Sequence, residues 1–233
     1  MRHLVSPVYI AAAAILILGD QGIAKADDTV AAVFAKIRPS LAIVVAREGS
    51  KVGAGSAFCI ESDDKHSYFL TNNHVLIGDQ VSLRVEIDGG IYSAQIVRRG
   101  TPPIDAAVLE IDRGNLPTVV LAAQLTPPGT HIAVAGYPSF HLNSDLNPSI
   151  HLGAINSILH GGTELEHDAV SDHGNSGGPL FDQESGVVYG INTAAVQSHT
   201  STNVVNLLAV AITATFPFLG NAKVAYKTDG SSE

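Results

Sequence analysis

The chain has 233 residues, of which 45% are hydrophobic and 15% charged, and its formal net charge at pH 7 is −9. This length can bury the core of one large domain or of two small ones. The acidic charge argues against nucleic acid or an anionic membrane surface as a partner. With Cys59 as the only cysteine, no intramolecular disulfide can form, so packing has to stabilise the fold.

Residues 1–26 have the pattern of a signal peptide. A basic start precedes an apolar run over residues 8–18, and Ala24-Lys25-Ala26 supplies the small-x-small pattern that signal peptidases recognise. The run is too short for a membrane-spanning helix, although an uncleaved N-terminal anchor remains an alternative. We therefore expect an exported protein, periplasmic or extracellular, that starts at Asp27 and has no stable membrane insertion after signal removal.

After Asp27, the sequence predicts one short helix and then strands. Asp28 is a capping residue ahead of apolar residues at helical spacing, and Pro39 ends the pattern. The later apolar runs are short, rich in β-formers and separated by turn residues. Expected strands cover residues 41–46, 56–60, 68–71, 81–87, 91–97 and 106–111, and then 119–121, 131–135, 150–155, 187–191 and 204–210. This spacing is typical of an all-β sandwich or barrel.

The turn-rich stretch 113–117 divides these strands into two series of about equal size. The simplest architecture is therefore two β-barrels. We expect residues 27–115 to form the helix and the first barrel, and residues 116–218 the second barrel. Residues 219–233 are polar without a clear period, which predicts a C-terminal surface tail.

The sharpest functional motif is Gly174-Asn175-Ser176-Gly177-Gly178-Pro179. Glycine at 174 lets the backbone turn so that the N–H groups of Gly174 and Ser176, on either side of Asn175, point into one concave oxyanion hole. The stretch lacks the following lysine of a phosphate-binding loop. We therefore expect Ser176 to be a nucleophile rather than part of an anion-binding loop.

A serine nucleophile needs a general base and a group that orients it. Of ten histidines, His74 stands out because it directly follows an apolar strand, at a loop position. Asp105 is the best orienting carboxylate because it precedes an apolar run that would bury its backbone. These residues predict a Ser-His-Asp triad.

Three blocks, at residues 70–75, 105–109 and 174–179, resemble the signatures of the trypsin-like superfamily and, within it, of bacterial HtrA (Deg)-type proteases. The order His, Asp, Ser also matches, and the resemblance spans residues 43–218. It implies two perpendicular antiparallel β-barrels with the cleft between them, with His74 and Asp105 from the first barrel and Ser176 from the second. It also implies a serine endopeptidase that acts on peptides or proteins and requires no cofactor.

The chain departs from related sequences in two respects. Asn175 stands where vertebrate digestive relatives carry an aspartate that pairs with a new amino terminus, so we expect signal-peptide removal to be the only processing. HtrA-type proteins usually continue into PDZ modules, but the segment after Phe218 is too short for one. We therefore expect neither a PDZ domain nor the regulation that depends on it.

The resemblance also places five residues near the first specificity pocket. Val170 and the stretch from Ile191 through Asn192 to Thr193 would surround it, without an acidic residue at its base. Such a pocket favours small or medium aliphatic side chains and disfavours Lys or Arg, whose charge would be buried unpaired. His173 and Asn192 would add polar selectivity.

The sequence allows three other interpretations, which concern the function, the histidines and the cysteine. A catalytically silent trypsin-like fold acting as a protein-binding module is the alternative function. His160 and His167, with Glu164 and Glu166 near, invite a metal site, but their spacing fixes no ligand geometry, so we expect no metal and solvated loop histidines. Cys59 is expected to be a small buried hydrophobe rather than a nucleophile.

Overall fold

The structure is a computed structural model that describes residues 24–78, 82–138, 147–197 and 205–230. The apolar run of the expected signal peptide lies outside the described residues, as do residues 139–146 and 198–204. Within the described part, no helix has both the length and the apolar character needed to cross a membrane.

The first half of the chain forms a closed antiparallel barrel. It follows helix α1 (Ala24–Ile37) and the short 3₁₀ helix η1 (Arg38–Ser40). Around the barrel the order is β1-β2-β3-β6-β5-β4, and side chains such as Val44, Phe69 and Leu109 fill its interior. The strands are β1 (Leu41–Glu48), β2 (Lys51–Ser62), β3 (Ser67–Thr71), β4 (Ser82–Ile87), β5 (Gly90–Arg99) and β6 (Ala107–Ile111).

The second half forms another closed ring, in the order β11-β8-β9-β10-β13-β12, because β12 pairs back onto β11. Its interior holds a separate apolar cluster that includes Val134, Leu165 and Leu180. The strands are β8 (His131–Gly136), β9 (Ser149–Leu159), β10 (Glu164–His167), β11 (Pro179–Asp182), β12 (Val188–Gln197) and β13 (Val205–Ala211). Short strands β7 (Val120–Leu121) and β14 (Lys227–Thr228) extend this sheet beside β12. The predicted all-β fold of two barrels with a short N-terminal helix is confirmed.

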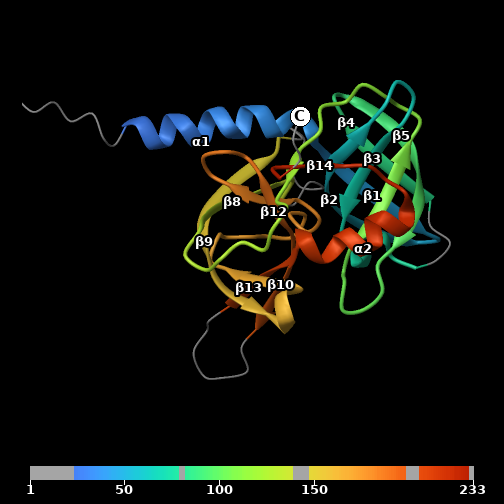
Figure 1. The fold of residues 1–233 in the computed structure, drawn as a ribbon. Coiled ribbons are helices and arrows are strands. Elements are labelled where there is room, and N and C mark those ends of the chain that lie inside the picture. Colours follow the sequence, from blue (N-terminus) through green and yellow to red (C-terminus); the bar gives the residue numbers. More distant parts are fainter. Residues whose placement is uncertain (1–23, 79–81, 139–146, 198–204, 231–233) are drawn as a thin grey trace, which may run out of the picture.

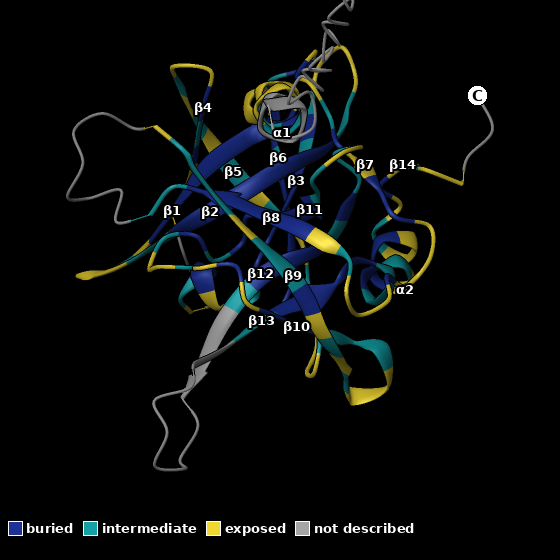
Figure 2. Cartoon of the chain, turned by 90° about the vertical axis from the view of Figure 1, so that its left-hand side faces the viewer, coloured by how far each residue is buried: buried dark blue, intermediate teal, exposed yellow. Residues whose placement is uncertain are grey.

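A third apolar cluster joins the two barrels and the helices. Phe58 and Leu70 from the first barrel, Phe181 from the second, Ile37 of α1 and Leu219 of α2 (Ile212–Ala222) belong to it. Figure 1 shows the barrels next to each other, with α1 along the top of the view and α2 across the front. In Figure 2 the buried residues concentrate in the strands and the exposed ones at the turns. This shared core fixes how the loops of the two barrels face each other.

Several elements differ from the prediction. Helix α1 already includes Ala24, so Asp28 lies inside the helix and does not cap it. Strands β10, β11 and β14 and helix α2 were not predicted, because two of the strands are only four residues long and α2 contains Pro217. Residues 219–230, expected as a surface tail, hold the end of α2, the buried side chain of Val224 and β14.

Candidate active site

His74 and Asp105 are brought together by two neighbouring strands. β3 ends at Thr71 and pairs with the start of β6, so that Thr71 lies opposite Ala107. His74, in the 3₁₀ helix η2 (Asn73–Leu76), comes three positions after the end of β3, and Asp105 lies two positions before the start of β6. Antiparallel pairing therefore places both at the same end of the first barrel. The Asn72 amide donates to the Asp105 carbonyl at 2.8 Å and holds the two loops together.

The Asp105 carboxylate accepts three hydrogen bonds. The His74 ring is bound through Nδ1 at 2.6 Å to Oδ2, the His74 backbone N–H donates to Oδ1 at 3.0 Å, and the Thr193 hydroxyl donates to Oδ2 at 2.8 Å. Burial by itself opposes ionisation of Asp105, but these hydrogen bonds outweigh it and hold its pKa below the usual value. The imidazole is thereby held in the tautomer that leaves Nε2 as the acceptor.

Hydrogen bonds to its backbone fix the Ser176 loop to both barrels. Ser56 of β2 donates its N–H to the Ser176 carbonyl at 2.8 Å and its hydroxyl to the Gly174 carbonyl at 2.7 Å. On the other side, Gly177 donates to the Asn192 carbonyl at 2.8 Å and Asn192 donates to the Gly178 carbonyl at 2.9 Å. The nucleophile loop is therefore held between β2 and β12.

Gly177 shows why this loop needs glycine. Its φ is +87°, and a Cβ there would lie 2.1 Å from the Ser56 carbonyl oxygen and 2.4 Å from the Thr71 hydroxyl oxygen. Neither the backbone angle nor the space accepts a larger residue. The close approach of this loop to β2 thus depends on the missing side chain.

The N–H groups expected to form the oxyanion hole have no acceptor among the described residues. Gly174 has φ +101°, and neither its N–H nor that of Ser176 takes part in a hydrogen bond there, whereas the Asn175 N–H donates to the Asp172 carbonyl at 3.0 Å. The Asn175 side chain is buried, and its amide has no partner within the described part of the chain. In the described part of the chain, two of the three residues therefore have a backbone N–H without an acceptor.

Ser176 and His74 line one cavity of about 430 Å³, together with His173, Thr193, Ser171, Asp172 and Leu207. The Ser176 hydroxyl donates to the Thr193 carbonyl at 2.9 Å, and it makes no hydrogen bond to His74. Residues from both barrels thus converge on one space, with the serine hydroxyl directed to β12.

The residues predicted for the specificity pocket separate into two groups. His173 and Thr193 line the cavity. Val170 is 64% exposed and Ile191 lies in the core between the barrels, and the structure brings neither to the cavity. Asn192 is buried behind it, with its amide donating to the Ser171 hydroxyl at 2.8 Å. Because side chains alternate along a strand, successive β12 residues cannot all face the cavity.

Sequence reasoning missed several participants. Ser56, which supports the nucleophile loop, was predicted as a strand residue without a role in the site, and Ser171, Asp172 and Leu207 were not predicted as lining residues. Thr193 was assigned to the pocket, but its hydroxyl also binds Asp105 from the other barrel. For Ser56 and Thr193, the only local signal in the sequence is a hydroxyl side chain at the end of an apolar strand.

The expected solvated state of the loop histidines is wrong for His167. It lies in β10, is 1% exposed, and neither ring nitrogen has a hydrogen-bond partner among the described residues. His160 is exposed, with Nδ1 2.8 Å from a Glu164 carboxylate oxygen. The described histidine and acidic residues bring three ligand atoms within 4.8 Å of one another only at His66, Glu110 and Asp112, at the ends of β3 and β6.

The predicted buried state of Cys59 is confirmed. The residue is fully buried, and its burial raises the thiol pKa to about 12. A thiol that stays protonated near neutral pH is not a nucleophile.

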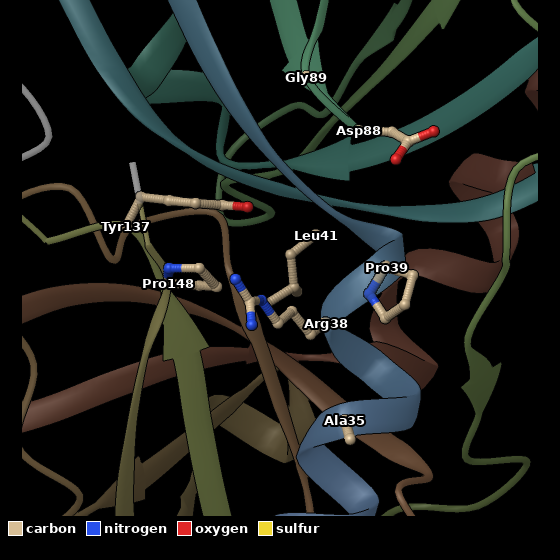
Figure 3. Close-up of a pocket in the computed structure, with 8 residues that line it drawn as sticks. All are labelled: Ala35, Arg38, Pro39, Leu41, Asp88, Gly89, Tyr137 and Pro148. Carbon is tan, nitrogen blue, oxygen red and sulfur yellow. The ribbon is translucent and has the colours of Figure 1, made fainter. Parts of the chain in front are cut away.

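A second cavity, of about 540 Å³, lies where α1 meets the two barrels. Arg38, Leu41, Asp88, Tyr137 and Pro148 are among its lining residues, and Figure 3 shows the Arg38 guanidinium and the Tyr137 ring extending into this space. None of the predicted catalytic residues lines it. The cavity at Ser176 is therefore the candidate active site.

Comparisons with known proteins agree with this arrangement. The family model described as "Trypsin-like peptidase domain" matches residues 55–191. The chain is 36% identical over 143 residues to a probable periplasmic serine endoprotease DegP-like of Halomonas elongata, covering 60% of this chain and 29% of that protein. It is 32% identical over 161 residues to serine protease HTRA1 of Xenopus laevis, covering 64% and 33%. The chain thus spans about a third of the length of these curated relatives.

Solved structures show the same fold. The serine endoprotease of Yersinia pestis matches with a TM-score of 0.67 and 25% identity, covering 83% of this chain and 66% of that one. The active form of the Rv3671c protease from M. tuberculosis matches with a TM-score of 0.69 and 20% identity, covering 95% and 96%. With a family model that covers more than half of its length, the chain belongs to the trypsin-like peptidase domain family.

Proposed function

We propose that this chain is a serine-type endopeptidase in which Ser176 is the nucleophile, His74 the general base and Asp105 the group that orients and stabilises the imidazolium. The observation that carries the proposal is the convergence of three segments. A His74 ring bound to Asp105 at 2.6 Å and the Ser176 hydroxyl line the same cavity, although they come from different barrels. DegP-like and HTRA1 relatives are named as serine proteases, which supports the same activity.

The reaction is acyl transfer in two halves. His74 Nε2 takes the proton of the Ser176 hydroxyl while its oxygen attacks the scissile carbonyl, and the imidazolium then gives that proton to the leaving amine. Water repeats the sequence on the acyl-enzyme, releases the acid and restores the serine. For the first step the hydroxyl has to leave the Thr193 carbonyl, to which it donates at 2.9 Å.

The developing oxyanion would be held by the N–H groups of Gly174 and Ser176, with Asn175 as the link between them. Both N–H groups lack an acceptor among the described residues, so binding an oxyanion would break no existing bond. Loss of one such donor typically raises the barrier by about 2.7–4 kcal/mol. The loop would therefore contribute a large share of the rate.

Export follows from the signal-peptide pattern of residues 1–26, and DegP-like relatives named as periplasmic support it. The substrates would be peptides or proteins. The preference for small or medium aliphatic side chains rested on Val170 and Ile191, and neither lines the cavity. Leu207 is the one aliphatic residue that does, so the lining gives that preference little support.

The alternative is a catalytically silent fold that binds proteins. It is favoured by one observation, the Ser176 hydroxyl bound to Thr193 rather than to His74. Incubation of the mature chain with a fluorophosphonate distinguishes the two, because only an activated serine is phosphonylated. We expect covalent labelling of Ser176 that vanishes in Ser176→Ala and persists in Ser93→Ala, a matched control on an exposed position of β5. Absence of labelling in the parent chain would support the binding module.

A further inference from the structure

Most of the residues that line the cavity beside Ser176 have polar side chains. Serine, aspartate, histidine and threonine line it next to the catalytic residues, and Leu207 is the one aliphatic side chain among its lining residues. In an acyl-enzyme, the side chain next to the serine belongs to the residue whose carbonyl carbon was attacked, here termed the acyl residue. Because Ser176 lines this cavity, it is the candidate space for the side chain of the acyl residue.

Ser171 presents a free hydrogen-bond donor to this cavity. Its oxygen accepts from the Asn192 amide at 2.8 Å, and its own hydrogen has no acceptor among the described residues. Asn192 is 1% exposed and also donates to the Asn175 carbonyl at 3.1 Å, so its amide orientation is fixed by two acceptors. The geometry holds Ser171 in place and leaves its hydroxyl hydrogen available.

Among the described residues, His167 is a further unpaired polar group, on the sheet face that also carries Leu207. His167 pairs with Leu207 across β10 and β13, and directly opposite residues carry their side chains on the same face of a sheet. The ring is buried and neither nitrogen has a hydrogen-bond partner in the described part of the chain. Burial lowers the pKa of His167 and so favours the neutral ring.

Asp172 is the only acidic residue among those that line the cavity. Asp172 is exposed, and one of its carboxylate oxygens accepts from the His173 N–H at 2.7 Å. Ser171 and the buried Asn192 amide that holds it are uncharged. A cation or carboxylate placed against Ser171 and Asn192 would lack an opposite charge there, and a buried unpaired charge is unfavourable.

We propose that this cavity selects an acyl residue with a neutral, hydrogen-bonding side chain, and that Ser171, held by Asn192, determines that preference. The inference rests on the proposed endopeptidase function and deepens it. Threonine and asparagine match the shapes of valine and leucine, so each pair differs mainly in its polar atoms. Leu207 packs against the apolar part of such a side chain, while the polar atom of the substrate side chain accepts a hydrogen bond from the Ser171 hydroxyl.

The test uses peptidyl phosphonates and matched peptides that differ only in the acyl residue. We expect the Thr reagent to react about five-fold faster than the Val reagent, and the Asn reagent similarly faster than the Leu reagent. Ser171→Ala should bring both ratios close to one, and Ser171→Val should reverse them, whereas Ser93→Ala should leave them as in the parent. Ratios are compared within each variant, so a general loss of activity cancels.

The outcomes separate the two proposals. Labelling by a small fluorophosphonate together with faster reaction of Val and Leu reagents would overturn this inference and leave the endopeptidase standing. Fastest reaction of a Lys reagent would also overturn it and would point to Asp172 as the selective group. Fastest reaction of a Glu reagent would likewise overturn the preference for a neutral side chain. No labelling by any reagent would refute the endopeptidase and the inference with it.

Discussion

Thr193 provides the most direct test of how the two barrels cooperate. Its hydroxyl, on β12, donates to Asp105 Oδ2 at 2.8 Å and so ties the second barrel to the His74–Asp105 pair of the first. Thr193→Val removes this donor and keeps the side-chain shape. A hydrogen bond to a charged group contributes about 1.5–3 kcal/mol, and partial solvent exposure of Asp105 reduces this to about 1–2 kcal/mol.

If the lost bond acts through the orientation of the imidazole, kcat/KM should fall about five- to thirty-fold. The unfolding free energy should also change with pH in a defined direction. The pKa of Asp105 is depressed in the fold, so its contribution is present above the unfolded pKa and is lost as pH falls through the folded pKa. Without the Thr193 donor that pKa rises, so the stability deficit of Thr193→Val should be largest near neutral pH and shrink in acid.

The measurement is urea unfolding followed by circular dichroism at neutral and acidic pH, since the chain has no tryptophan to report by fluorescence. Turnover of a peptide substrate is measured in parallel. Thr118→Val is the matched control, because Thr118 is half-buried and makes no side-chain hydrogen bond among the described residues. A deficit that does not vary with pH, or an unchanged kcat/KM, would refute the idea that Thr193 positions the pair through Asp105.

Three further changes test other parts of the site. Ser176→Ala and His74→Ala should each lower turnover by on the order of 10⁶, and the double variant little further, because the groups act as one unit; additive losses in single-turnover assays would contradict this. Gly177→Ala should destabilise the fold far more than Gly129→Ala in urea unfolding. Both glycines have φ +87°, but only at Gly177 would the new methyl meet a carbonyl of β2 at 2.1 Å. Equal losses of stability would show that the loop can shift. Cys59, with a thiol pKa of about 12, should react with iodoacetamide at pH 8 only after unfolding; rapid modification of the native chain would contradict its burial.

Much of the site could be predicted because its chemistry is local in the sequence. Each signal can be recognised within a few residues: the glycines around Ser176, the strand ahead of His74 and the apolar run after Asp105. Most strands were visible for the same reason, since alternation and turn residues act over short distances. Elements whose stability comes from their neighbours were missed. β10 is held between β9 and β13, and α2 packs Leu219 into the core between the barrels despite Pro217.

The sequence by itself determined which residue types were available for acyl transfer and in what order they occur. Only the tertiary structure decided that Thr193 binds Asp105, that Ser56 supports the Ser176 loop, and that Ser171 rather than Val170 faces the cavity. The physical reason is that these contacts join segments separated by 88 to 118 positions, in the case of Thr193 and Ser56. Their geometry depends on how two closed barrels pack, and no local pattern encodes that packing.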